Sequence, residues 1–590
     1  MKDFVKMTLA AILGCLVTGA VIIFISMGII GSIASLGHSS PVIPREAMLT
    51  VDMSKITVSD QTVPADLTRS LQGDARISMG LLTTVKAIQA AAMDPSIKFI
   101  YLKPDGVSGD MAVIEELRTA LERFRSSGKA VIAFIENPSN ASYYLASVAD
   151  RIFMTSYDGS MNMINGFSSQ MIFLKDILGK LGVNMQLIRH GKYKSAGEMY
   201  VRSSASPENI EQNQVMINSL WKSWAGKMAA SRDMETDRFN ELVDGLKLVA
   251  PEDFKEYGLV DELLGREELT QRICGLYGAE SPEDAHQVSI ADYAAAKVTP
   301  VFKAKEKIAV IYAEGNIIDG DSKEQVSGDR FARIISNVRK DSTVKAVVFR
   351  VNSPGGSVLA SEKIKAEIDR LKAVKPVVAS YGSYAASGGY WISSSCSYIF
   401  SDESTLTGSI GVFSMIPDFS KTADKIGIGV TTVNSGRHSD MYSGTRALDK
   451  DEEAYLQASV EDIYDTFTSL VAEGRGLGKE YVDGIAQGRV WAGNDALEIG
   501  LVDRIGGLED AISYAISLSG SSNTDISSWM ISEYPEPMTA VDIILEKLGQ
   551  KATVFKGTSL EPVERAFSGI GTDRTGKAYA RLPYELNIRY

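Results

Sequence analysis

The 590-residue chain has a formal net charge of −13, with 45% hydrophobic and 23% charged residues, a composition typical of globular protein. It contains no basic run that would favour nucleic acid, and its four histidines are too scattered for a histidine-rich metal site. Three cysteines do not make a disulfide framework, and a chain this long exceeds a single hydrophobic core. We therefore expect several domains and no nucleic-acid partner, metal or cofactor.

The N-terminus contains a long apolar segment, Met7 to Leu36, without any charged residue. As a helix it is long enough to cross a hydrocarbon core of about 30 Å, whereas a secretory signal has an apolar region of only about 7–15 residues. We expect an uncleaved anchor that contacts membrane lipid through residues 7–36, with a cleaved signal as the alternative. Lys2 and Lys6 precede it, which predicts a single pass through the cytoplasmic (inner) membrane, with the N-terminus inside and the rest on the outer, periplasmic side.

The remaining chain repeats itself with an offset of about 250 residues, so that Lys98 aligns with Lys345. Each half has a strand, a helix of about a dozen residues and a second strand, expected at 98–103, 111–126 and 130–135, and at 345–350, 359–371 and 376–380. A long helix follows in each half, at 208–230 and at 450–474. This alternation predicts α/β domains with mainly parallel strand pairing.

The predicted domain limits follow from the duplication. They are an N-terminus and anchor at 1–46, a first domain at 47–280, a linker at 281–306, a second domain at 307–520 and a C-terminal tail at 521–590. The linker is placed by Pro282, Pro300 and the alanine run Ala294 to Ala296. In the tail only a short helix at 540–548 is predicted.

A candidate nucleophile lies in the second half. The apolar run Lys375 to Ala379 leads into Ser380–Trp391, a stretch of small residues with Ser387 followed by two glycines. This pattern predicts a strand, a tight turn and a helix, with the serine beside backbone N–H groups that could stabilise an oxyanion. A tight turn packed for space is the structural alternative. The first half carries Asn140 at the aligned position, so that half lacks the nucleophile.

A candidate base lies in the first half. Lys194 aligns with Ser439 of the second half, so the serine survives only in one half and the lysine only in the other. Complementary losses of this kind suggest one composite site. A free lysine has a pKa near 10.4, and a lysine base needs burial that lowers it to about 7–8. Glu198 would oppose this change if it turned inward, and Lys192 and His438 remain rival bases.

The chain resembles the signal peptide peptidase A (protease IV) family in its long, duplicated form. The resemblance covers the anchor and residues 47–520, and it rests on the segments 352–356, 385–391, 405–411 and 193–195. It implies two tandem domains of the Clp protease/crotonase fold, built from repeated β-β-α units in a superhelix. It also implies a bowl-shaped homotetramer.

The same resemblance assigns roles to individual residues. It implies that Ser387 is the nucleophile, that Lys194 is the general base and acid, and that Ser409 orients the lysine. The N–H groups of Gly356, or as an alternative Gly355, and of Gly388 would form the oxyanion hole.

The activity expected from these assignments is that of a serine endopeptidase that degrades apolar peptides, such as signal peptide remnants at the membrane. Two other hypotheses about the function remain. One is a catalytically inactive membrane scaffold of the same fold, and the other is a crotonase-like acyl-CoA enzyme. The second would need a carboxylate acid/base and an adenine site, and the sequence marks neither.

Overall fold

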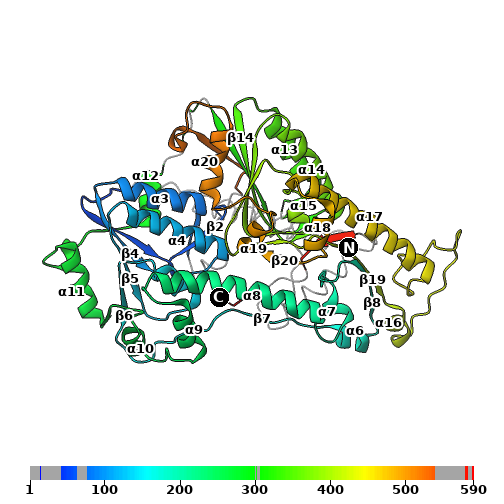
Figure 1. The fold of residues 1–590 in the computed structure, drawn as a ribbon, viewed down its shortest axis with the longest axis horizontal. Coiled ribbons are helices and arrows are strands. Elements are labelled where there is room, and N and C mark those ends of the chain that lie inside the picture. Colours follow the sequence, from blue (N-terminus) through cyan, green and yellow to red (C-terminus); the bar gives the residue numbers. More distant parts are fainter. Residues whose placement is uncertain are drawn as a thin grey trace.

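The computed structural model describes residues 41–62, 76–298, 306–323, 325–537, 578–582 and 588–589, together with residues 14, 301 and 304. Three β-sheets carry the architecture of these residues (Figure 1). Two of them belong to the two halves of the chain. The third joins the halves, and it positions the candidate site.

The first half forms a six-stranded sheet in which all neighbouring strands are parallel. Its strands, in sheet order, are β10 (Gln287–Ser289), β1 (Ala47–Asp52), β4 (Ile97–Lys103), β5 (Val131–Ile135), β6 (Arg151–Thr155) and β9 (Glu262–Leu264). Apolar side chains leave both faces of the sheet, as parallel sheets require. Two helices, α3 (Leu81–Met93) and α4 (Met111–Ser126), cover one face, and α11 (Arg266–Tyr277) covers the other.

The second half repeats this sheet. Its strands are β22 (Met530–Tyr534), β11 (Lys307–Glu314), β14 (Val344–Ser353), β16 (Val377–Ala386), β17 (Tyr398–Ser401) and β21 (Arg504–Ile505), with β18 (Leu406–Gly408) and β20 (Val490–Ala492) also extending from β16. The strand order from β22 to β21 matches the order from β10 to β9 in the first half. Helices α13 (Gly328–Lys340) and α14 (Val358–Lys372) pack on one face and α20 (Leu508–Leu518) on the other.

The strand–helix–strand units that the sequence predicts are present in both halves, and so are the long helices α8 (Pro207–Ala230) and α17 (Lys450–Arg475). Two segments differ from expectation. β16 continues past Ser380 to Ala386 because its small residues still pair with β14 and β18, although they lack an apolar strand signal. Within the predicted linker, β10 and α12 (Ile290–Lys297) pack on the first half, since alanine favours helix and Ile290 and Tyr293 are buried.

The third sheet is assembled from both halves and the tail. Its strands, in order, are β13 (Val326–Ser327), β12 (Ile317–Ile318), β15 (Gly355–Ser357), β23 (Ala578–Arg581), β19 (Val412–Asp418) and β8 (Asn184–His190). β8 comes from the first half and pairs with β19 of the second over seven residue pairs. The tail strand β23, red in Figure 1, lies between β15 and β19. This sheet brings loops from distant parts of the sequence to one place.

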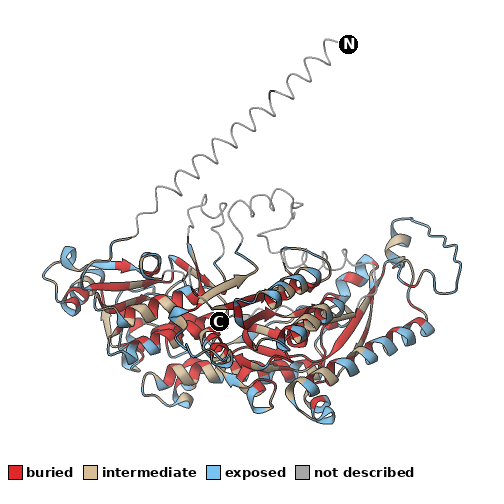
Figure 2. Ribbon diagram, turned by 90° about the horizontal axis from the view of Figure 1, so that it is seen from above, coloured by how far each residue is buried: buried red, intermediate tan, exposed pale blue. Residues whose placement is uncertain are grey.

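Buried residues run through both halves and across their junction (Figure 2). The junction contains a buried ionic cluster in which Arg350 of β14 contacts Asp60 and Glu116 of the first half. The Arg350 Nη2 atom lies 2.8 Å from Asp60 Oδ1 and 2.8 Å from Glu116 Oε1. Two buried carboxylates of the first half therefore depend on one guanidinium of the second.

Replacing Arg350 with methionine should lower the free energy of unfolding by about 3–5 kcal/mol, because two buried carboxylates would lose their cation. Arg333→Met is the matched control. Arg333 pairs with Asp321 at 2.6 Å, but both side chains are more than half exposed, so its loss should cost at most about 1 kcal/mol. Denaturant unfolding of the two variants measures the difference. Equal effects would mean that the buried cluster does not hold the halves together.

Among the described residues, no helix combines the length and the apolar character needed to cross a membrane. The predicted anchor at residues 7–36 lies outside the described residues, apart from Gly14. The predicted tail helix at 540–548 also lies outside them.

Candidate active site

Ser387 lies at the end of β16, where the strand turns into the single helical turn α15 (Gly388–Trp391). Its backbone has φ 55° and ψ −113°, which is rare for a residue with a side chain and marks a sharp, constrained turn. The turn is fixed on both sides. The Ser387 N–H donates to the Gly408 carbonyl (2.8 Å), and the Trp391 N–H donates to the Ser387 carbonyl (2.8 Å). The predicted strand, turn and helix are therefore present.

Lys194 follows β8 and reaches from the first half into the second. Its Nζ atom lies 2.8 Å from Ser387 Oγ and 3.1 Å from both the Oγ and the carbonyl oxygen of Ser409. All three residues have 0% of their surface exposed. The structure thus brings together, within one chain, the serine and the lysine that the two halves keep separately.

The loop that carries Lys194 is held against the second half by close backbone contacts. The Tyr193 N–H donates to the Gln487 carbonyl at 2.9 Å. A Cβ atom at Gly488 would lie 2.5 Å from the Lys194 Cβ, and one at Gly411 would lie 3.2 Å from the Lys194 Cδ. These two glycines leave room for the lysine stem, so the aliphatic chain is packed against backbone and its direction is fixed.

Burial lowers the pKa of Lys194 well below its usual value of 10.5. Among the described residues, no carboxylate forms an ion pair with its Nζ atom. Glu198 points elsewhere: its Oε1 lies 3.0 Å from Arg189 Nη1, and its Oε2 accepts from the Ser206 N–H and from Asn209. A buried lysine without an anionic partner favours the neutral amine, which can accept a proton.

The structure does not bring either rival base to Ser387. Lys192 is exposed, with its Nζ 4.9 Å from the ring centre of Tyr193. The His438 Nδ1 atom instead lies 3.0 Å from Glu452 Oε1.

His438 and Glu452, with Asp449, form the only group of potential metal ligands found among the described residues, within 4.8 Å of one another. Arg446 already supplies a cation there, with its Nη2 2.7 Å from Glu452 Oε1. The group is also separate from the serine and the lysine.

The predicted oxyanion glycines lie beside Ser387. Gly388 begins α15, and the first N–H groups of a helix have no acceptor within it. Gly355 has φ +97°, and a Cβ atom there would lie 2.6 Å from the Gly388 nitrogen. A Cβ atom at Gly388 would lie 3.0 Å from the Gly356 nitrogen. The Gly356 and Gly388 nitrogens therefore approach one small space that tolerates no side chain at 355.

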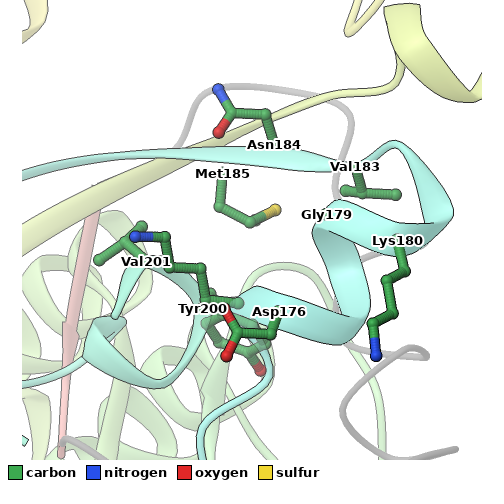
Figure 3. Close-up of a pocket in the computed structure, with 9 residues that line it drawn as sticks. Asp176, Gly179, Lys180, Val183, Asn184, Met185, Tyr200 and Val201 are labelled. Atoms are coloured by element: carbon green, nitrogen blue, oxygen red, sulfur yellow. The ribbon is translucent and has the colours of Figure 1, made fainter. Parts of the chain in front are cut away.

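A surface pocket of about 520 Å³ lies between α6 (Lys175–Leu181), α7 (Glu198–Val201) and the start of β8 (Figure 3). Asp176, Met185 and Tyr200 are among its lining residues, and none of the predicted site residues lines it. This pocket is therefore distinct from the site around Ser387.

The residues that align with Ser387 and Lys194 in the opposite half of the chain support a single site built from both halves. Asn140, opposite Ser387, is buried at the start of α5 (Asn140–Ala146), and its Nδ2 donates to the Gly166 carbonyl at 2.9 Å. Ser439, opposite Lys194, is exposed in a surface loop. The amide is held in a structural hydrogen bond, and the exposed serine does not contact the site.

Sequence reasoning missed the tail strand β23, which lies directly beside the site. Its only signal is the short run Ala578–Leu582, in which small or apolar residues alternate with Tyr579 and Arg581. Five alternating residues at the end of an otherwise unassigned segment are too few to predict a strand.

A comparison with protein families matches the model described as peptidase family S49 twice, over residues 123–278 and 369–521. Lys194 lies in the first match, and Ser387 and Ser409 lie in the second. The chain belongs to peptidase family S49. The two matches also show that the S49 domain is duplicated in this chain.

Curated relatives extend the similarity over most of the chain. "Protease 4" of Haemophilus influenzae is 36% identical over 82% of this chain and 81% of its own length. "Protease 4" of Salmonella typhi is 36% identical, over 79% and 76%. "Serine protease SPPA, chloroplastic" of Arabidopsis thaliana is 29% identical, over 90% and 80%.

Among solved structures, the ClpP1 N165D mutant from Listeria monocytogenes aligns with 34% of this chain and 94% of its own. The TM-score is 0.24 and the sequence identity is 16%. This similarity is too low to support a conclusion about the fold. Membership of family S49 and the Protease 4 relatives establish the chain as a serine protease. They favour it over the inactive scaffold and over the acyl-CoA enzyme.

Proposed function

We propose that the chain is an endopeptidase in which Ser387 and Lys194 form a catalytic Ser/Lys dyad. The observation that carries this proposal is the 2.8 Å contact between Ser387 Oγ and the Nζ atom of Lys194, a fully buried lysine that has no carboxylate partner among the described residues. A serine hydroxyl becomes nucleophilic when a neighbouring base accepts its proton. Burial makes Lys194 such a base, because it lowers the pKa of the ammonium.

The proposed reaction is acyl transfer in two steps. Neutral Lys194 takes the Ser387 proton as Oγ bonds to the carbonyl carbon of the scissile peptide. The oxyanion is stabilised by the N–H groups of Gly356 and Gly388, and Lys194 then gives its proton to the leaving amine. Water repeats the sequence on the acyl-enzyme and frees the serine. No metal or cofactor is needed for any step.

Ser409 is proposed to orient the lysine. Ser409 belongs to the second half of the chain, and its hydroxyl and carbonyl oxygens both lie 3.1 Å from the Lys194 Nζ atom. Two contacts of this kind restrict the rotation of the amine and direct it toward Ser387. The backbone of Ser409 is itself constrained, with φ 48°.

The fold, substrates and location are part of the same proposal. Each half would have the Clp/crotonase fold, and four chains would form the bowl that the family resemblance implies. The substrates would be extended apolar peptides, including signal peptide remnants. Residues 7–36 would anchor the catalytic domains at the outer face of the cytoplasmic membrane, which their uncharged sequence supports. Sedimentation for the tetramer and alkaline extraction of membranes for the anchor are the direct tests.

The pH dependence of peptide hydrolysis tests the dyad. Only neutral Lys194 can act as the base, so kcat/KM should fall about tenfold for each pH unit below the working pKa of the lysine and level off above it. That pKa should lie well below 10.5, since burial lowers it. The measurement is kcat/KM for an apolar fluorogenic peptide across the pH range in which the chain stays folded. Absence of hydrolysis at every pH, or a flat profile at acid pH, would refute the proposal.

A further inference from the structure

The loop that carries Lys194 has a further support, which comes from the long helix α8. Gln212 of this helix is buried, and its Nε2 atom lies 2.9 Å from the Tyr193 carbonyl oxygen and 2.9 Å from Ser195 Oγ. A third acceptor, Asn209 Oδ1, is more distant, at 3.5 Å. One amide group therefore bridges the two residues that flank Lys194 in the chain.

The other end of the same amide faces the second half. The Val490 N–H of β20 donates to Gln212 Oε1 at 3.4 Å. The residue before it, Arg489, accepts the Ser409 N–H on its carbonyl at 2.7 Å. The amide nitrogen faces acceptors and the amide oxygen faces a donor, so the partners fix the orientation of the group. Gln212 thus connects the loop of the proposed base with the segment that holds Ser409.

Other contacts hold the same loop at single points. The Tyr193 N–H donates to the Gln487 carbonyl, and Arg189 Nη1 donates to the Lys194 carbonyl at 2.7 Å. Gln212 differs because one side chain contacts the residues on both sides of Lys194 and also reaches β20. Loss of its amide would release both neighbours of the lysine at once.

The chemistry depends on where this loop places the lysine amine. Lys194 Nζ lies 2.8 Å from Ser387 Oγ, a distance that permits direct proton transfer. A displacement of about 1 Å can cost about 10²-fold in rate. A group that fixes the backbone around Lys194 therefore affects turnover without touching the reacting atoms.

We propose that Gln212 is a positioning residue of the endopeptidase, which holds the backbone on both sides of Lys194 so that the amine stays in contact with Ser387 and Ser409. This inference rests on the proposed dyad. Gln212 acts through the loop, since its amide bonds to Tyr193 and Ser195 and not to the lysine amine. Without the amide, the loop moves, the contact between amine and serine lengthens, and water reaches the amine.

Charged and titratable groups flank the loop, and each has a partner of its own. They are Arg189 with Glu198 (3.0 Å), Arg489 with Glu211 (3.6 Å), Lys192 with the ring of Tyr193 (4.9 Å) and His190 with the ring of Tyr464 (3.8 Å). Within the described part of the chain, none of these groups contacts Lys194 Nζ. A difference in pH profile between the parent and a variant at position 212 therefore reports on Lys194.

Gln212→Met tests the proposal, because methionine has a similar length but can neither donate to the loop nor accept from Val490. Gln214→Met is the matched control on the same helix. Gln214 is exposed, and its Nε2 lies 2.8 Å from Asn218 Oδ1. For an apolar fluorogenic peptide, Gln212→Met should lower kcat about 10²-fold with little change in KM. Gln214→Met should keep both constants within about twofold of the parent.

The pH profile separates positioning from a general loss of stability. Burial lowers the pKa of Lys194, so a loosened loop that admits water should raise that pKa toward 10.5. The acid limb of kcat/KM for Gln212→Met should therefore move to higher pH, and part of the lost activity should return at alkaline pH. Partial unfolding would lower activity without moving the limb. An unmoved limb would overturn the positioning role and leave the dyad intact, whereas a parent without hydrolysis would overturn the dyad.

Ser195→Ala is a milder variant, because it removes only one hydroxyl that Gln212 contacts. It should lower kcat by less than Gln212→Met does and move the acid limb in the same direction. In the Gln212→Met background it should have no further effect, because both substitutions remove the same contact. Additive losses would contradict the proposal. If denaturant unfolding shows that Gln212→Met is not folded, Ser195→Ala decides alone, and a parental kcat and pH profile would refute the role of Gln212.

Discussion

Replacing Lys194 with methionine, or Ser387 with alanine, should reduce kcat/KM for an apolar peptide by at least about 10⁴-fold. Members of a catalytic pair act as a unit, so either loss removes nearly all the covalent pathway. Methionine keeps most of the buried aliphatic stem that packs against Gly411 and Gly488 but cannot accept a proton. The measurement is steady-state hydrolysis of a fluorogenic peptide by the parent and the two variants.

Lys192→Met is the control for Lys194→Met, because it removes a neighbouring lysine that is exposed and does not contact Ser387. It should leave turnover within about twofold of the parent. If Lys192→Met loses activity while Lys194→Met keeps it, the base has been assigned to the wrong residue. If neither lysine matters and Ser387 does, a base other than a lysine of this loop is at work.

Stability provides an independent check on the same variant. The pKa of Lys194 is lower in the folded chain than in the unfolded chain, so below pH 10.5 the unfolded state binds more protons and stability rises with pH. The stability penalty therefore develops as the pH falls from 10.5 toward the folded-state pKa. Lys194→Met removes this dependence, and it should be at least as stable as the parent at neutral pH. Lost activity in a stable variant cannot result from unfolding.

Much of the site could be predicted from the sequence because the duplication supplied an internal comparison. Asn140 opposite Ser387, and Ser439 opposite Lys194, indicated which half kept each group. The structure adds what alignment lacks: the loop after β8 reaches the second half because β8 and β19 pair across the junction. No local pattern in either strand specifies a partner more than 200 residues away.

Other features depend on long-range pairing that no short pattern contains. β22 completes the second sheet as β10 completes the first, yet the sequence suggested only a tail and a linker there. Ion pairs such as Arg350 with Asp60 could not be predicted from the sequence either, because each residue alone resembles a charged surface residue. The predicted elements were those with strong periodicity of their own, and the missed ones gain stability only from their neighbours in a sheet.

Replacing Gly355 with alanine should lower turnover by about 10²–10³-fold, which is the range for loss of one oxyanion donor. The sequence left open whether Gly355 or Gly356 supplies the N–H group, and the register favours Gly356, with Gly355 providing space. A methyl group at 355 would lie 2.2 Å from the Ala580 oxygen and 2.6 Å from the Gly388 nitrogen. It would therefore exclude the carbonyl of any peptide from the two donors.

The left-handed backbone of Gly355 requires a control, since alanine at a φ of +97° costs about 1–2 kcal/mol wherever it occurs. Gly315 has nearly the same φ, +95°, but no atom of the described residues lies within 4 Å of a Cβ atom placed there. Gly315→Ala should thus show the stability cost of the left-handed backbone alone, without the close contacts, while keeping the turnover of the parent. If both variants lose turnover equally, strain and not the oxyanion space explains the effect. If only Gly355→Ala loses turnover, catalysis depends on the open space beside the Gly356 and Gly388 nitrogens.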